Sequence, residues 1–430
     1  MTRTYRIFQA AALILGTSLV CWAQGDAGIV SNLFRKGEAA YQKREYGAFL
    51  EAMEQAWQVA PDQPDVLYGL ARASALAGKS AQAIKALDKL AAMDLGWNAP
   101  QDPDLASLRD LPGFRSFLAK LDKERRPVAK SVPAFTLTER DLFPEGIAYD
   151  PVSGAFYLTS VAKRKIVVRD KSGAVSDFIS PGQDGFLSGL GIKVDAQRRM
   201  LWVCTADTPR MEGHGPATAG LSGVFTYDLA TKKLLKKFVL DATTGPHMLN
   251  DLVLTSQGGA YVTDSLAGAV YSIAPGQDNL LLLTPYGYYL APNGIALSPD
   301  ESRLFVAYAG GVATVNLKTG ERGELAHPAK MALGGMDGMA FYRDSLIGIQ
   351  SEARRVARFF LNKAMDKVDR MEVLEAHNPL FAGIPTTGTL DGDAFVYIAD
   401  SQVNAVGSDG RFLPADKLQD IQVLKVALAP

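Results

Sequence analysis

The sequence predicts a mainly β protein: a six-bladed β-propeller preceded by an α-helical domain. A strand–turn–strand unit recurs after about residue 134, with successive units starting at residues 145, 190, 250, 293, 337 and 387. A period of about 40–50 residues with several strands per unit is typical of a propeller, because radial repetition leaves only short, protected sheet edges. Before residue 125 the apolar residues recur at helical spacing instead. The 40 Gly and 22 Pro supply the turns that a sheet-rich chain needs.

The first 23 residues have the pattern of a cleavable export signal. Arg3 and Arg6 precede the apolar run 10–20, and the mature chain is expected to start near Gln24. The apolar run is much shorter than the ~20 residues that a membrane span needs, so we expect no span. Cys21 leaves a lipoprotein tether as the alternative to ordinary cleavage. We therefore predict a periplasmic or secreted protein.

Charge and cysteine content narrow the function classes. Lys and Arg number 45 against 46 Asp and Glu, and no basic stripe could follow a phosphate backbone, so nucleic acid is not an expected partner. Removal of the signal leaves Cys204 alone, which excludes a disulfide within the mature chain. Cys204 ends the apolar strand 201–204 and is expected to be a small buried hydrophobic residue.

Residues 24–125 are predicted to form the helical domain, joined to the propeller by a Pro-containing linker at 126–133. Two stretches superpose with an offset of 34 residues, so that Gly37 and Met53 match Ala71 and Leu87. Small residues let two helices approach closely, and larger ones fill the groove between them. The pattern resembles a pair of tetratricopeptide repeats, which implies a docking module for a protein partner. A helical cap that only packs on the propeller is the alternative, because two repeats are fewer than an independent solenoid needs.

The predicted propeller, residues 134–430, consists of paired strands. The pairs are 145–149 with 155–158, 190–194 with 200–203, 250–254 with 260–262, 293–297 with 304–306, 337–341 with 346–349, and 387–390 with 395–398. We expect the apolar strand 421–428 or the early strand 134–138 to complete the ring by pairing the chain ends.

The residue just before each inner strand is expected to lie at one end of the axial channel. These positions carry Glu145, Leu190, Asn250, Asn293 and Asp337. Two carboxylates and two amide oxygens form a hard oxygen cluster with a charge of about −2, which suits Ca²⁺ better than a softer ion. Asn-Gly and Asp-Gly are also ordinary turn formers, and this is the alternative for each residue singly.

Four segments together resemble those of the gluconolactonase, regucalcin, paraoxonase and squid-type diisopropylfluorophosphatase superfamily, the senescence marker protein type of six-bladed propeller. The segments are Pro144-Glu145-Gly146, Asn250-Asp251, Pro292-Asn293-Gly294 and Asp337-Gly338-Met339. The resemblance implies a divalent ion, Ca²⁺ or another such as Mg²⁺, Mn²⁺ or Zn²⁺, that contacts substrate. It implies metal ligation by Glu145, Asn250, Asn293 and Asp337, with Asp337 also a candidate base.

Departures from the family bear on the substrate. Leu190 stands where paraoxonases carry a histidine, and Met248 stands where gluconolactonase-like members carry an arginine. His247 is a candidate proton shuttle, and the alternative is a neutral hydrogen-bonding residue. Asp337, Asp251 and His247 are thus the candidate catalytic residues.

Two further features are candidate pocket walls. Loop 205–222 is the longest connection on the face where inner strands begin, and it is either a lid or an ordinary surface loop. Tyr286, Tyr288 and Tyr289 either line an apolar pocket or pack between blades.

These observations predict an exported, divalent-metal-dependent hydrolase of a lactone or ester. The metal would polarise a carbonyl oxygen of a small molecule in the axial channel, while Asp337 and Asp251 orient or deprotonate water. The alternative is a non-catalytic propeller with a structural metal, coupled to helical repeats that bind a protein.

Overall fold

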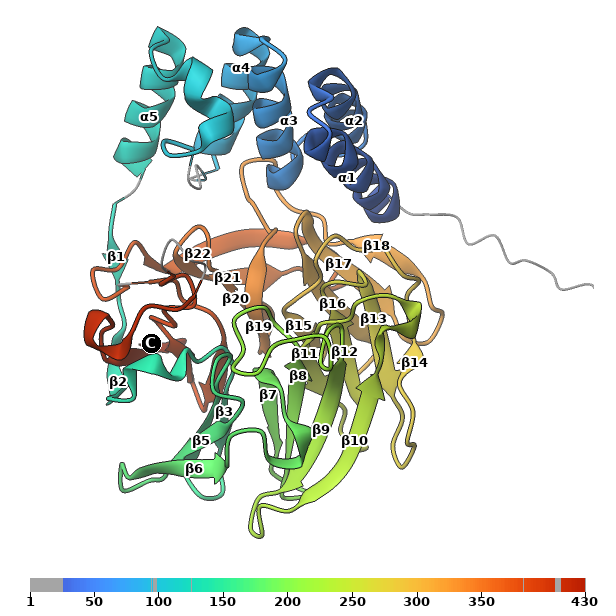
Figure 1. The fold of residues 1–430 in the computed structure, drawn as a ribbon, viewed down its shortest axis with the longest axis vertical. Coiled ribbons are helices and arrows are strands. Elements are labelled where there is room, and N and C mark those ends of the chain that lie inside the picture. Colours follow the sequence, from blue (N-terminus) through green and yellow to red (C-terminus); the bar gives the residue numbers. More distant parts are fainter. Residues whose placement is uncertain are drawn as a thin grey trace, which may run out of the picture.

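The computed structural model describes residues 26–93, 95, 99–124, 126–381, 383–406 and 411–429. The predicted signal, including Cys21, lies outside these residues. Within them, helices sit over one face of a ring of sheets (Figure 1). The predicted fold class, a six-bladed propeller behind a helical repeat region, is confirmed. None of the described helices is long and apolar enough to cross a membrane.

Antiparallel helices build the N-terminal part. They are α1 (Asp26–Gln42), α2 (Tyr46–Val59), α3 (Pro64–Leu76), α4 (Ser80–Ala91), the 3-10 helix η1 (Pro103–Leu108) and α5 (Pro112–Glu124). Proline opens α3 at its first turn, where the missing N–H has no helical partner to lose. The helices pack on one apolar core that includes Leu67, Leu87 and Phe117.

Met53 of α2 fills the groove between its neighbours, as the repeat pattern predicted. A Cβ added at Gly37 of α1 would lie 2.8 Å from Met53 Cε, and one at Gly69 of α3 would lie 2.7 Å from Met53 Sδ. Both helices therefore approach α2 more closely than a larger side chain would allow.

Six separate antiparallel sheets form the blades. In chain order from the axis outward the first three blades are β3 (Ile147–Asp150), β4 (Ala155–Thr159), β5 (Ile166–Arg169) and β6 (Val175–Ile179); β7 (Ser188–Asp195), β8 (Met200–Ala206), β9 (Ser222–Asp228) and β10 (Leu234–Leu240); and β11 (Leu249–Leu254), β12 (Ala260–Asp264), β13 (Ala269–Ile273) and β14 (Leu281–Leu282). The fourth and fifth blades are β15 (Ile295–Leu297), β16 (Arg303–Tyr308), β17 (Gly311–Asn316) and β18 (Arg322–Glu324); and β19 (Met336–Tyr342), β20 (Ser345–Gln350), β21 (Arg355–Leu361) and β22 (Val368–Ala376).

Both chain ends complete the last blade. It contains β23 (Gly388–Asp391), β24 (Ala394–Ile398), β25 (Ile421–Ala427) and, outermost, β2 (Val132–Leu137). Phe135 pairs with Val423, so the two strands predicted as alternatives for closing the ring pair with each other. The short strand β1 (Val128–Ala129) adds to the fifth blade by pairing with β22. Residues of the predicted linker 126–133 therefore pair with strands of the propeller. The domain boundaries stay a prediction.

Apolar side chains fill the spaces between successive blades. Cys204 is fully buried in one such cluster beside Trp202 and Val262, and it is a free thiol within the described residues. Burial is the main cause that raises the pKa of the Cys204 thiol well above its ordinary value. This cysteine is therefore an inert core residue.

The helical part rests directly on the propeller. Gln63 Nε2 donates to Tyr308 Oη at 2.9 Å, and Tyr308 Oη donates to Glu324 Oε2 at 3.0 Å. Ala332 of the propeller belongs to the apolar core of the helices, while Ala27 of α1 belongs to an apolar cluster of the propeller. The contacts place the start of α3 over the face where the inner strands begin.

Candidate metal centre on the propeller axis

The six inner strands contact one another in order around the axis: β3, β7, β11, β15, β19 and β23. Threonine hydroxyls of one blade donate hydrogen bonds to backbone carbonyls at the start of the inner strand of the next blade. Thr159 Oγ1 donates to Leu190 O at 3.0 Å, Thr263 Oγ1 to Asn293 O at 2.9 Å, and Thr387 Oγ1 to Glu145 O at 2.6 Å. The equivalent positions in the sequence repeats therefore form a ring in space.

Glycines after the ring positions allow this close approach. A Cβ at Gly191 would lie 2.6 Å from both Asn250 O and Asp251 Oδ1, and one at Gly338 would lie 2.8 Å from Thr387 Cα. A Cβ at Gly146 would collide with Leu190 O. The glycines that follow Glu145, Leu190 and Asp337 thus serve inter-strand packing as well as the turn.

Oxygen atoms without partners cluster at this ring. Glu145 Oε2, Asn250 Oδ1 and Asn293 Oδ1 are buried and accept no hydrogen bond from the described residues, and Asp251 Oδ2 is in the same situation. An unsatisfied buried acceptor costs about 1–3 kcal/mol, so several at one place call for a cation or water. Hard oxygen donors of this kind fit Ca²⁺ or another hard divalent ion.

The amide groups are held so that their oxygens stay available. Asn250 Nδ2 donates to Ser265 Oγ at 2.8 Å, and Asn293 Nδ2 donates to Asp337 Oδ1 at 2.5 Å. In the described part of the chain, no three His, Cys, Asp or Glu side chains lie close enough together to share a metal. An ion at the ring would therefore depend on the amide oxygens as well as on carboxylates.

Charge repulsion and burial dominate the acids of the ring. Burial raises the pKa of Glu145 well above its ordinary value, and the nearby charges of Asp337 and Asp251 raise it further. Burial also raises the pKa of Asp337 to about 6, although hydrogen bonds from Ser351 Oγ (3.0 Å) and Asn293 oppose the rise. A bound cation would reverse these shifts, because opposite charge favours the ionised carboxylate.

Lys193 is a charged residue beside the ring that the sequence analysis missed. It lies on β7, and its Nζ is 2.9 Å from Asp251 Oδ1, which also accepts the Leu252 N–H at 2.8 Å. Asp251 is only 1 % exposed, so the lysine balances a buried carboxylate. A single charged residue within the otherwise apolar inner strand 190–194 was the available signal.

His247 is held by hydrogen bonds at both of its ring nitrogens. Its Nδ1 lies 2.7 Å from Asp264 Oδ2 and its Nε2 lies 2.9 Å from Thr244 Oγ1. Asp264 Oδ1 in turn accepts the backbone N–H of Met248 at 2.9 Å. Both ring nitrogens of this buried histidine are thus engaged by protein groups, which favours the hydrogen-bonding interpretation over the proton shuttle.

A cavity of about 280 Å³ opens beside the ring, between the propeller and the helices. Of the predicted ligands, Asn293 and Asp337 line it, together with Ser351 and Glu352. Glu145, Asn250 and Asp251 are not among its lining residues. The cavity therefore meets the candidate centre on the side of β15 and β19.

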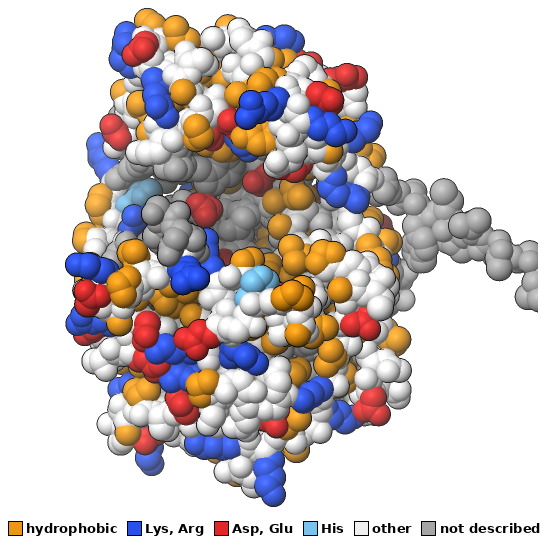
Figure 2. All heavy atoms as spheres, viewed as in Figure 1, with side chains coloured by type: hydrophobic (Ala, Val, Ile, Leu, Met, Phe, Trp, Pro, Cys, Tyr) orange, Lys and Arg blue, Asp and Glu red, His pale blue; other side chains and the backbone are white. Residues whose placement is uncertain are grey.

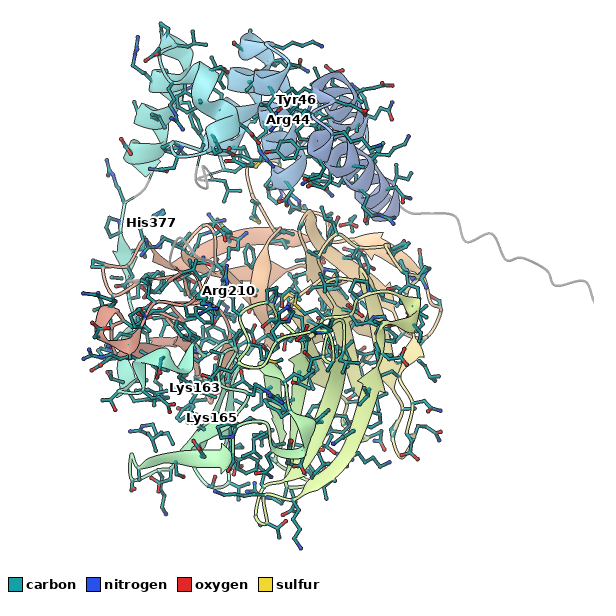
Figure 3. All side chains as sticks on the ribbon, viewed as in Figure 1. Arg44, Tyr46, Lys163, Lys165, Arg210 and His377 are labelled. Atoms are coloured by element: carbon teal, nitrogen blue, oxygen red, sulfur yellow. The ribbon has the colours of Figure 1, made fainter. Side chains whose placement is uncertain are left out.

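The predicted lid and tyrosines lie elsewhere. Residues 209–214 of the loop between β8 and β9 line a second cavity of about 550 Å³, with Lys163 and Phe412. Arg210 Nη1 donates to Val403 O at 2.6 Å, and Arg210 and Lys163 lie below the helices in Figure 3. Tyr289 is buried between blades with Tyr288 packed against it, so these two rings follow the packing interpretation, whereas Tyr286 is exposed.

Comparison with known proteins gives two kinds of similarity. A model of the tetratricopeptide repeat family matches residues 40–109, as the 34-residue offset predicted. No curated protein matches the sequence.

Solved structures with similar folds include several propellers. A gluconolactonase from Xanthomonas campestris is 17% identical with a TM-score of 0.46, covering 70% of this chain and 98% of that one. Regucalcin, a calcium-binding protein from Agrobacterium tumefaciens, is 16% identical with a TM-score of 0.48, covering 68% and 93%. A PQQ-bound aldose sugar dehydrogenase from Streptomyces coelicolor is 14% identical with a TM-score of 0.45, covering 70% and 99%. The six-bladed propeller that the resemblance implied is confirmed by the chain's own sheet topology, and the chemistry must be argued from this chain's own residues.

Proposed function

We propose that the protein is an exported, divalent-metal-dependent hydrolase of a small lactone or ester. The observation that carries the proposal is the convergence of unpartnered buried oxygens from Glu145, Asn250 and Asn293 beside a cavity lined by Asp337. Such a cavity, with a few convergent polar groups of shifted pKa, is the usual setting of a reaction site.

The residues at the ring would have different roles in the proposed reaction. Glu145, Asn250, Asn293 and Asp337 would hold the ion, which when bound supplies Lewis-acid polarisation of a carbonyl and lowers the pKa of bound water. Asp337 lines the cavity and is held by hydrogen bonds from Asn293 and Ser351, so in this proposal it would take a proton from the attacking water. Lys193 would position Asp251 beside the ring through their 2.9 Å contact.

The proposal is tested by turnover of a panel of lactones and aryl esters by the purified chain. We expect activity with one or more of Ca²⁺, Mg²⁺, Mn²⁺ and Zn²⁺, its loss with EDTA while the circular dichroism spectrum is retained, and its return on metal addition. Asp337→Asn should abolish turnover. Asn404→Ala, at an exposed loop position, is the matched control and should retain it. Turnover that survives EDTA, or none with any of the four ions, would overturn the proposal.

The match of residues 40–109 to tetratricopeptide repeats favours a second candidate, a non-catalytic propeller that binds a protein partner through its helices. The same ring would then hold a structural ion. Metal addition that raises the melting temperature, without turnover of any ester or lactone, is the result that would favour this candidate.

A further inference from the structure

The cavity beside the ring has walls from both parts of the chain. Pro64 and Asp65 at the start of α3 and Leu95 after α4 line it together with Asn293 and Asp337. On the face shown in Figure 2, the surface is hollowed where the helices meet the propeller, and Asp or Glu side chains lie at its margin. A ligand in this cavity would therefore contact the helical part as well as the propeller.

All charged residues of the cavity are acidic. Asp65, Asp337 and Glu352 line it, and none of its described lining residues is Lys, Arg or His. Lys193 is paired with Asp251 and does not line the cavity. A dication would offset the two carboxylates of the ring, which leaves Asp65 and Glu352 without a compensating charge.

Asp65 has no partner that would explain its position. Among the described residues, its carboxylate makes no hydrogen bond or ion pair with another side chain, and burial raises its pKa to about 7. An acid in the first turn of a helix is ordinary, because it complements the helix dipole. That explanation does not account for its placement against the propeller, where burial disfavours the charged form.

The remaining lining is apolar or neutral. Leu95, Met336 and Ile384 supply apolar surface, and Ser351 and Gln350 supply neutral polar groups. The volume of about 280 Å³ lies just below the ~300–1,000 Å³ that is typical of ligand pockets. The cavity thus fits a small molecule with an apolar portion.

We propose that the helical part forms a wall of the binding site, and that Asp65 and Glu352 select neutral or cationic esters and reject those carrying a carboxylate or phosphate. This selection rests on the proposed function for the identity of the ligand as an ester. Two observations support the selection: the cavity has walls from both parts of the chain, and all of its charged lining residues are acidic. An anionic ester would meet two uncompensated carboxylates and no cationic side chain.

Three ester probes of similar length test the selection by direct binding. Acetylcholine, its neutral isostere 3,3-dimethylbutyl acetate, and anionic monomethyl glutarate are titrated into the full chain at pH 8.5 and followed by ligand-observed NMR. We expect acetylcholine to bind about tenfold more tightly than the anion, as one unit charge a few Å from partly exposed carboxylates would give. Equal binding of the three probes, or preference for the anion, would overturn the inference.

One variant in the helical wall and one in the propeller wall of the cavity test whether these carboxylates cause the charge preference. Asp65→Asn and Glu352→Gln should each reduce the ratio of cation to anion affinity by about threefold or more. Asp62→Asn is the control, because Asp62 lies nearby, pairs with Lys89 at 3.1 Å and does not line the cavity. Unchanged ratios in both wall variants, or an equal change in Asp62→Asn, would contradict the assignment. Charge-ranked binding without turnover would defeat the hydrolase proposal and leave this inference standing.

Discussion

Lys193 Nζ and Asp251 Oδ1 lie 2.9 Å apart at the propeller axis, where they join the inner strands of two neighbouring blades. Asp251 is almost fully buried and the lysine side chain is about one-quarter exposed. The pair therefore combines a structural role with an electrostatic one, because Lys193 also lowers the pKa of Glu145 against the effect of burial.

Removing Lys193 should leave the buried carboxylate of Asp251 without its ion-pair partner. We expect Lys193→Met to lower the free energy of unfolding by about 3 kcal/mol in EDTA, because one partner of a buried pair is then left unpaired. Adding Asp251→Asn should recover part of this loss. Chemical unfolding of the single and double variants measures both effects. Lys236→Met is the control, since its pair with Asp278 is exposed and should be worth less than about 1 kcal/mol.

The four predicted ligands should act together on metal affinity. Asp337→Asn removes one of two ring carboxylates, and Asn293→Ala removes an oxygen that accepts no hydrogen bond from the described part of the chain. We expect each to weaken Ca²⁺ binding by tenfold or more in calorimetry on the full chain, a change of about 1.4 kcal/mol or more. Asn404→Ala should bind as the parent does. A parent that binds no divalent ion would refute the shared site.

Export should remove the first residues of the chain. The mass of protein recovered outside the cytoplasm should correspond to a start near Gln24, because Arg3, Arg6 and the apolar run 10–20 match a cleavable signal. A lipid adduct on Cys21 would identify the tethered alternative. Recovery of a chain that begins at Met1 would contradict both.

The ring could be predicted because the propeller repeats itself. Each unit places one residue at the start of an inner strand, so Glu145, Asn250, Asn293 and Asp337 converge although they are far apart in sequence. The strand pairs were visible for the same reason: alternation and turn residues are local signals.

The partners of the ring could not be predicted from these local signals. The Lys193–Asp251 pair depends on which side chain of β7 faces the axis and on which blade follows. The cavity wall that the helical part supplies depends on how α3 docks on the propeller through Gln63 and Tyr308. These two residues are separated by 245 positions. Such packing follows from shape complementarity between finished elements, which the local pattern does not encode.

Asp65 should make the stability of the protein depend on pH. Its folded-state pKa of about 7 lies above the ordinary value of about 4, so folding favours the protonated form. The resulting stabilisation is fully present below about pH 4 and is lost as the pH rises through 7. Asp337 and Asp400, whose pKa values burial raises to about 6, act in the same direction.

The contribution of Asp65 is isolated by difference. We expect the unfolding free energy of Asp65→Asn, relative to the parent, to rise between pH 4 and 8, because the asparagine does not ionise. Asn404→Ala, which removes no ionisable group, should give a flat difference curve. A flat curve for Asp65→Asn would show that its carboxyl titrates normally in the folded protein.

The docking of the helices should depend on one glycine and not on its neighbour. A Cβ at Gly310 would lie 2.5 Å from Gln63 Oε1 and 2.7 Å from Tyr308 Cε2, whereas one at Gly311 would meet nothing closer than 3.6 Å. Gly310→Ala should therefore displace Gln63 and weaken its bond to Tyr308, at a cost of about 1–3 kcal/mol for overpacking. Gly311→Ala is the matched control. Hydrogen exchange followed by mass spectrometry should show faster exchange in peptides from α1 to α3 for Gly310→Ala alone. Equal exchange in the two variants would mean that this contact does not hold the helices over the cavity.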